Sequence, residues 1–88
     1  MQVYMVERSL KGISMDALAA AQKRAIDTAQ KLSKEGTPVR YIRSTFVPEE
    51  GCCMCLFSAE RSEDVKRLNE TAQIPFDRIV PALDLTPN

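Results

Sequence analysis

Residues 39–57 read VRYIRSTFV-PEEG-CCMCLF, and this stretch decides the fold of the chain. Two runs rich in β-branched, aromatic and other apolar residues flank a short break with Pro48 and Gly51, which is the pattern of a β-hairpin. Because side chains alternate along a strand, the second run is apolar on both faces. Cys53, Cys55 and Phe57 share one face, and Cys52, Met54 and Leu56 share the other. A strand of this kind is expected to be covered on both sides.

The flanking segments predict a β-α-β-β-α-β order. Residues 2–8 are rich in strand formers, and residues 15–33 repeat apolar side chains at helical spacing. A second helical pattern ends before Pro75, and residues 78–83 form a last strand, in which Pro81 is typical of a sheet edge. This order predicts an α+β, ferredoxin-like sandwich, with an antiparallel sheet and two helices on one face.

The length of the chain leaves one face of this sheet bare. We expect a single domain over residues 1–84 and a polar tail over residues 85–88, with no further element to cover the second face. The simplest partner is a second copy of the chain, packed sheet to sheet as in dimeric α+β barrels. A homodimer through the sheet face is therefore predicted.

The charges exclude several classes of partner. Twelve basic and twelve acidic residues are interspersed, so we expect neither nucleic-acid binding nor membrane binding. No run approaches the roughly 20 apolar residues of a membrane span, and the first residues lack the pattern of a signal peptide. The three cysteines are odd in number and crowded on one segment, which favours reduced thiols and a cytoplasmic location.

Four short motifs, in order along the chain, carry a resemblance to a known family. They are Tyr4-Met-Val-Glu-Arg8, Val39-Arg-Tyr-Ile-Arg-Ser44, Cys55-Leu-Phe-Ser-Ala59 and Ile74-Pro-Phe-Asp-Arg-Ile79. On these motifs the chain resembles the bacterial family called domain of unknown function 4242, one member of which is described as a nickel-binding protein. The resemblance covers nearly the whole chain and implies a ferredoxin-like fold, a dimer and a nickel-binding relative.

Two family positions argue against nickel in this chain. Arg43 stands where the family often has histidine, and Ser58 stands where it often has glutamate. The chain contains no histidine at all, whereas nickel and zinc sites favour imidazole and thiolate ligands. We therefore expect the fold and the dimer to carry over from the family, but not a nickel site that relies on histidine.

The cysteines have two main interpretations. Cys53 and Cys55 share a strand face and are the candidate metal ligands, for nickel, zinc or copper. Cysteine also packs as a small apolar residue and is among the side chains most often buried. Because one strand supplies every thiol, we expect core packing and no bound cofactor, with thiol reactivity as a further alternative.

Polar residues of the hairpin form a candidate ligand site. Tyr41, Arg43 and Ser44 precede the turn, and Cys55 follows it. Together they predict a small polar cleft in which Arg43 pairs with a carboxylate, either of a ligand or of Glu7. For Tyr41 the simpler interpretation is a half-buried aromatic ring with a satisfied hydroxyl.

Glu7 and Arg8 end the first strand on opposite faces, so one of them points into the covered interior. A buried Glu7 carboxylate would serve as an acid or base. The simpler interpretation is a structural ion pair at the strand end.

Three functions follow from these residues. The leading hypothesis is a small-ligand-binding protein that resembles the nickel-binding family without its histidine ligands. The alternative is a cofactor-free isomerase or monooxygenase-like enzyme of the dimeric α+β barrel type, with Glu7 as acid or base and with Arg43 and Tyr41 orienting the substrate. The third is a structural or regulatory dimer. Without histidine, a Ser-His or Cys-His pair is excluded.

Overall fold

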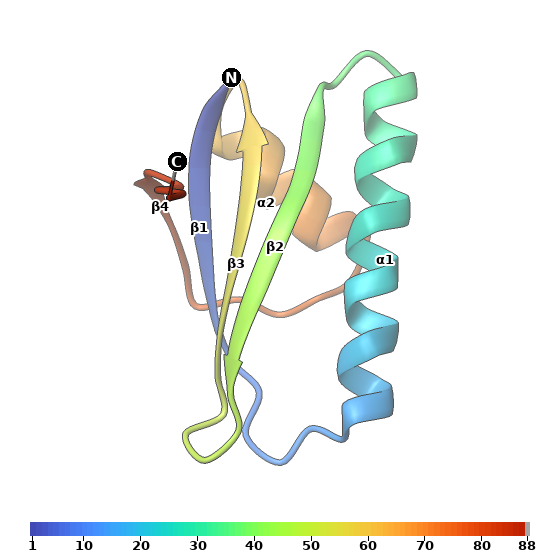
Figure 1. Cartoon of the computed structure of the whole chain (residues 1–88). Helices are drawn as coiled ribbons and strands as arrows, with labels where there is room; N and C mark the ends of the chain where they lie inside the picture. Colours follow the sequence, from blue (N-terminus) through green and yellow to red (C-terminus); the bar gives the residue numbers. More distant parts are fainter. Residues whose placement is uncertain (88) are drawn as a thin grey trace.

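A computed structural model describes residues 1–87. The elements run β-α-β-β-α-β, as predicted (Figure 1). They are β1 (Gln2–Ser9), α1 (Met15–Lys34), β2 (Val39–Val47), β3 (Cys52–Ala59), α2 (Ser62–Thr71) and β4 (Arg78–Ala82). Of the predicted tail, residue 88 lies outside the described residues.

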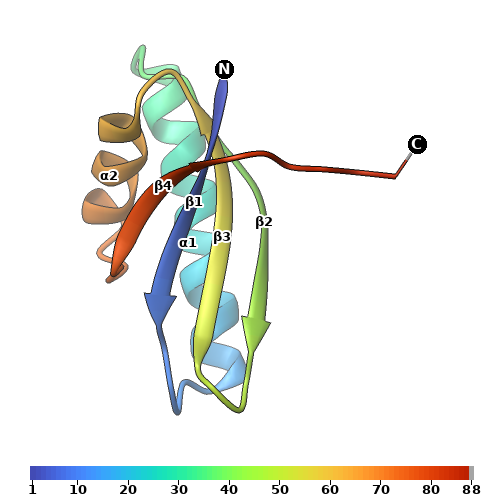
Figure 2. The ribbon, with the colours of Figure 1, turned by 90° about the vertical axis from the view of Figure 1, so that its left-hand side faces the viewer.

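The strands form one antiparallel sheet in the order β2-β3-β1-β4. Both helices pack on the same face of this sheet, as two views at right angles show (Figures 1 and 2). The two central strands are therefore β3 and β1, and Pro81 lies in β4 at an edge, where its missing N–H costs no ladder hydrogen bond. The ferredoxin-like α+β fold predicted from the sequence is confirmed.

Helix α1 begins and ends on local signals. The Ser14 hydroxyl accepts a hydrogen bond from the Ala17 amide at 3.1 Å, and Asp16 places a negative charge in the first turn. The buried stripe of the helix contains Ala25, Ala29 and Leu32. Small residues along this stripe let the helix axis lie close to the sheet.

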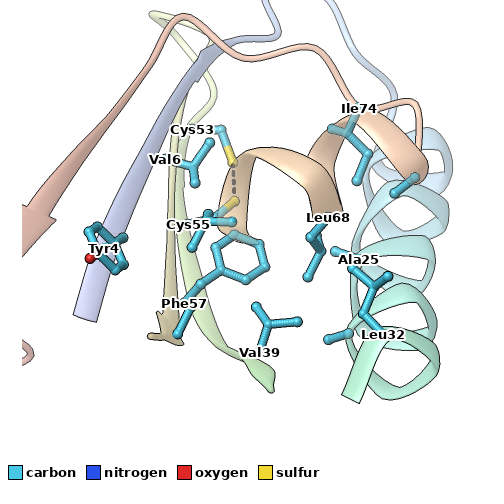
Figure 3. Close-up of a cluster of buried hydrophobic side chains, with 14 residues drawn as sticks. Tyr4, Val6, Ala25, Leu32, Val39, Cys53, Cys55, Phe57, Leu68 and Ile74 are labelled. Atoms are coloured by element: carbon cyan, nitrogen blue, oxygen red, sulfur yellow. Dashed lines mark hydrogen bonds between the residues drawn. The ribbon is translucent and has the colours of Figure 1, made fainter. Parts of the chain in front are cut away.

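The core lies between the helices and the sheet (Figure 3). Val6 and Phe57 point from the two central strands toward Leu68 of α2, and all three are fully buried. Burying an apolar side chain of this size contributes about 1.5–3 kcal/mol. Cys53 and Cys55 lie in the same layer with 2% and 6% of their surface exposed, so packing is part of what these cysteines do.

A β-bulge interrupts β2 at Ile42. Tyr41 pairs with Phe57, but Arg43 pairs with Leu56, so that Ile42 is an extra residue in the ladder. Bulges are common at sheet edges, and this one reverses the alternation of the second half of the strand. Ser44 therefore faces the helices, and Arg43 faces the opposite side.

The β2–β3 turn is fixed by Gly51. The residue has a φ of +69° and is buried, and its carbonyl oxygen accepts a hydrogen bond from the Leu10 amide at 2.6 Å. A Cβ atom at this position would collide with the backbone of Lys11. The turn thus packs directly on the loop between β1 and α1, and only glycine fits there.

The second face of the sheet is called the open face. Its central apolar side chains are only partly buried, and in the described residues no helix covers them. These side chains are Val3, Met5, Met54, Leu56 and Val80. After β4 the chain runs away from the body of the molecule (Figure 2), and Leu83 and Leu85 are 82% and 85% exposed.

Within residues 1–87, neither helix combines the length and the apolar composition of a membrane span.

Candidate functional site

A cavity of about 150 Å³ lies between α1 and the sheet. We call it the helix-side cavity. Its apolar lining consists of Leu10, Leu18, Ala21, Phe46 and Ile74. Its polar and thiol lining consists of Arg8, Gln22, Ser44, Cys53 and Cys55. A small number of polar groups in a mainly apolar pocket is the usual composition of a small-molecule site.

A chain of hydrogen bonds runs along this cavity from the surface to the interior. The Gln22 amide donates to the Tyr41 hydroxyl at 2.9 Å, and the hydroxyls of Tyr41 and Ser44 lie 2.7 Å apart. Ser44 donates its only hydroxyl proton to the Cys55 sulfur at 2.9 Å, so Tyr41 must be the donor to Ser44. The Cys55 and Cys53 sulfur atoms lie 3.8 Å apart at the inner end (Figure 3). We call this arrangement the polar chain.

The bulge in β2 makes the polar chain possible. It turns Ser44 to the helix side, where Tyr41 already lies, and brings the Ser44 hydroxyl opposite its ladder partner Cys55. The Tyr41 ring is held by Phe57, edge to face, with ring centroids 5.5 Å apart. The hydroxyl groups are therefore positioned by the sheet and by the core.

Arg8 brings a charge into the wall of the cavity. Only 2% of its surface is exposed. Its Nη1 donates to the Asn69 Oδ1 at 2.8 Å and to the Pro75 carbonyl oxygen at 3.1 Å. Asn69 is fully buried and is held in turn by a hydrogen bond from its Nδ2 to the Val65 carbonyl oxygen at 2.8 Å. The guanidinium is therefore rigidly placed.

The Cys53 thiol beside Arg8 is protonated at neutral pH. Burial, followed by the neighbouring Cys55, raises the pKa of Cys53 to about 11, and the Arg8 charge only partly opposes this. A neutral thiol is a poor nucleophile and a poor metal ligand. Cys53 and Cys55 are free cysteines, as expected from their spacing.

The predicted cleft is divided between the two faces of the sheet. Tyr41, Ser44 and Cys55 are brought together in the polar chain. Arg43 points to the open face, where it forms an ion pair with Asp84. The expected pairing of Arg43 with Glu7 does not occur, because Arg43 lies on β2 and Glu7 on β1, and β3 separates these two strands.

Glu7 also lies on the open face. Its carboxylate accepts a hydrogen bond from the Arg78 Nε at 2.6 Å, and Glu7 lines neither the helix-side cavity nor the shallow depression around Met54. This is the structural ion pair at a strand end. The enzyme hypothesis required Glu7 to face a cavity, and the single chain does not provide that geometry.

Sequence reasoning missed the roles of Gln22 and Asn69 and weighed Arg8 only as a strand-end charge. A signal for Arg8 was present, because Tyr4, Val6 and Arg8 alternate on one face of β1 and the first two are core residues. Gln22 and Asn69 carry no comparable signal, because polar residues on a helix are usually solvated.

Within residues 1–87, no three side chains of the histidine, cysteine, aspartate or glutamate type come together in a group that could hold a metal ion.

A family model described as "Nickel responsive protein SCO4226-like" matches residues 4–81. The chain belongs to the SCO4226-like family. This agrees with the nickel-responsive side of the resemblance seen in the sequence, whereas the numbered family of unknown function is not the one that matched. No curated protein matches the chain.

A solved structure shares the fold of this SCO4226-like protein. It is titled "Crystal structure analysis of SCO4226 from Streptomyces coelicolor A3(2)" and superposes with a TM-score of 0.78 at 22% sequence identity. The match covers 97% of this chain and 99% of the other. At this identity the likeness shows the fold alone.

The residues of this SCO4226-like chain do not fit nickel. It has no imidazole to offer, the described residues contain no three-ligand group, and the paired thiols lie beside a buried positive charge. Borderline divalent ions prefer imidazole or thiolate donors in a fixed geometry. In the part of the chain that the structure describes, the side chains therefore offer no ligand set that suits nickel.

Proposed function

We propose that this member of the SCO4226-like family binds a small organic molecule in the helix-side cavity, in place of nickel. The polar chain carries the proposal. It sets ordered donors and acceptors along one wall of a mainly apolar cavity, and such groups orient a ligand while the apolar walls hold it.

A packing role alone does not account for these groups. A core is filled most simply by apolar side chains, and each hydroxyl placed at its edge needs a partner. Here Gln22, Tyr41 and Ser44 satisfy one another, and Gln22 and Ser44 also line the cavity. The cavity is also left unfilled, whereas protein interiors are normally close-packed.

The experiment is a screen by amide chemical-shift mapping of the 15N-labelled protein with benzene-sized acids, amides and amines. Binding compounds are expected to shift the amides of Ser44, Cys53 and Cys55. Ala21→Leu fills the cavity from α1 and should abolish the shifts, whereas Ala20→Leu, on the exposed side of the same helix, should not. The proposed function is refuted if no compound binds, or if binding compounds shift only residues outside the cavity.

The absence of a nickel site is tested by calorimetric titration with nickel, zinc and copper(I) under reducing conditions. We expect no stoichiometric binding of nickel. Zinc or copper(I) binding that disappears in a Cys53→Ser, Cys55→Ser variant would assign the thiol pair to a soft metal. Tight nickel binding that survives the same double substitution would contradict the proposal.

We also propose that the protein is a homodimer through the open face. A contiguous apolar strip of this kind on a small domain typically marks an interface. The zero net charge of the chain does not oppose self-association. The exposed Leu83 and Leu85 follow the edge strand β4, in a segment that runs away from the body of the molecule. Such a segment can pack its leucines against a second copy of the chain.

Sedimentation equilibrium tests the dimer. The wild type is expected at twice the mass of one chain, and Leu56→Arg, at the centre of the open face, is expected as a monomer. Ala20→Arg on the exposed side of α1 is the matched control and should stay dimeric. A monomeric wild type, or a dimeric Leu56→Arg protein, would refute this interface.

A further inference from the structure

We infer that the ligand of the helix-side cavity is an organic anion, a carboxylate with a small apolar body, and that the Arg8 guanidinium binds its charge. The inference rests on the proposed function and adds the chemical class of the ligand. Its basis is a buried positive charge at the cavity wall that no acidic residue between 1 and 87 neutralises.

Arg8 has no anionic partner among residues 1–87. Salt bridges in the described chain join Lys23 to Asp27, Arg43 to Asp84, Arg61 to Asp64 and Arg78 to Glu7, and none includes Arg8. A guanidinium with 98% of its surface buried is almost always paired with a carboxylate, because a lone buried charge is costly. Here it is bound only by two neutral oxygens.

The bonding of Arg8 leaves one edge of the guanidinium unused. Both hydrogen bonds leave from Nη1, whereas Nε and Nη2 donate to no residue of the described chain. No fully buried side-chain nitrogen in this part of the chain lacks a partner, so Nε and Nη2 each keep some accessible surface, and Arg8 lines the helix-side cavity. The Nε–Nη2 edge of a guanidinium is a fork that matches the two oxygens of a carboxylate.

The neighbouring Cys53 thiol does not supply the missing negative charge. Cys53 lies close enough to Arg8 to feel its charge, yet its pKa is raised to about 11 and it stays neutral at physiological pH. Two acidic side chains in the segments that hold Arg8 are engaged elsewhere: Glu7, its neighbour in β1, binds Arg78, and Asp77, two residues after Pro75, accepts a hydrogen bond from Ser9 at 2.7 Å. An anion from outside the chain is the remaining partner.

The size and the apolar lining of the cavity restrict the size and polarity of the rest of the ligand. At about 150 Å³ it matches the engineered apolar cavity that accepts benzene. Leu18 and Phe46 offer apolar walls, and Ser44 contributes a hydroxyl group to the lining. A single ring or a short branched chain that carries one carboxylate fits this description.

The test compares benzoate with its neutral isostere benzamide by titration calorimetry. We expect benzoate to bind the wild type more tightly by about tenfold to a hundredfold, the value of a charge-assisted hydrogen bond. In Arg8→Gln, which keeps a donor for Asn69, benzoate should lose this advantage, while benzamide should change by less than about twofold.

A second variant leaves Arg8 in place. Asn69→Asp puts a carboxylate at the position of Oδ1, 2.8 Å from Nη1, and neutralises the guanidinium from within the chain. It should weaken benzoate by about tenfold or more and leave benzamide unchanged. This variant keeps the test valid if Arg8→Gln fails to fold.

The outcomes separate the two proposals. Equal affinities for benzoate and benzamide in the wild type, both lost in Ala21→Leu, would overturn the anion and leave the cavity as a ligand site. A preference for benzylammonium would overturn it in the same way. No binding of acid, amide or amine would overturn both.

Discussion

The hydrogen bond between Arg8 and Asn69 supports a buried charge, and its removal makes a quantitative prediction. Asn69→Leu keeps the number and branching of the side-chain heavy atoms but replaces the Oδ1 acceptor, 2.8 Å from Nη1, with a methyl group. Arg8 then keeps only the Pro75 carbonyl oxygen, at 3.1 Å. A hydrogen bond to a charged group contributes about 1.5–3 kcal/mol, and water replaces it poorly here because 98% of the surface of Arg8 is buried.

We therefore expect Asn69→Leu to lower the free energy of unfolding by about 2 kcal/mol. For a domain of this size that is a fall of roughly 8–16 °C in the melting temperature. The loss of the second Asn69 bond adds little, because the Val65 carbonyl oxygen also accepts the helical amide bond of α2. Urea denaturation followed by circular dichroism, at one protein concentration for all variants, gives the measurement.

A double-mutant cycle decides whether the stability lost in Asn69→Leu comes from the Arg8 charge that has lost its hydrogen-bond acceptor. Arg8→Met removes the guanidinium, and with the charge absent Asn69→Leu should cost little or become favourable. The coupling between the two substitutions should reach about 1.5 kcal/mol or more. Additivity within about 0.5 kcal/mol would refute the reasoning and would mean that Arg8 is not held by Asn69 in solution. Glu70→Leu, exposed on the same helix, is the control and should change stability by less than about 0.5 kcal/mol.

Two further predictions concern stability. Burial raises the pKa of Cys53 from 9.0 to about 11, so the folded protein holds this proton more tightly than the unfolded chain; stability should be unaffected by this group below pH 9 and should fall between pH 9 and pH 11, by about 1.4 kcal/mol per pH unit. The free energy of unfolding, measured by urea denaturation from pH 8 to 10.5, should fall more steeply with pH in the wild type than in Cys53→Ala. Equal pH dependence in the two proteins would contradict the prediction. Gly51→Ala should cost at least about 2 kcal/mol, because strain at φ +69° and a backbone collision add. Gly36→Ala, at φ +97° with open space around the new Cβ, should cost only the strain, about 1–2 kcal/mol, and equal losses at both glycines would show that the collision is absent.

The fold could be predicted from the sequence because the turn, helix-cap and periodicity signals all indicated the same arrangement. The hairpin break at Gly51, the Ser14 cap and the period of α1 all point to the same arrangement, and the alternation of β3 assigned its faces correctly. These signals are local or depend on simple alternation, and each element carries its own.

The site was only partly readable, for two physical reasons. Simple alternation along β2 predicts Arg43 on the same face as Tyr41. The bulge at Ile42 puts the two residues on opposite faces, and no residue type in that stretch indicates a bulge. The partners of Arg8 lie 61 and 67 residues away, so their contact depends on how α2 and the following loop dock on the sheet. A single sequence holds no trace of such a contact.

The bulge has a consequence for insertions and deletions in β2. In a regular strand, the loss of one residue turns every later side chain to the wrong face, which is usually ruinous. Here the loss of Ile42 would restore plain alternation and leave Ser44 and Phe46 facing inward, opposite Cys55 and Cys53. A relative one residue shorter at this point can therefore keep the inner wall of the cavity, whereas one that is a residue longer cannot. The register of half a strand depends on the count of residues in this stretch more than on their identity.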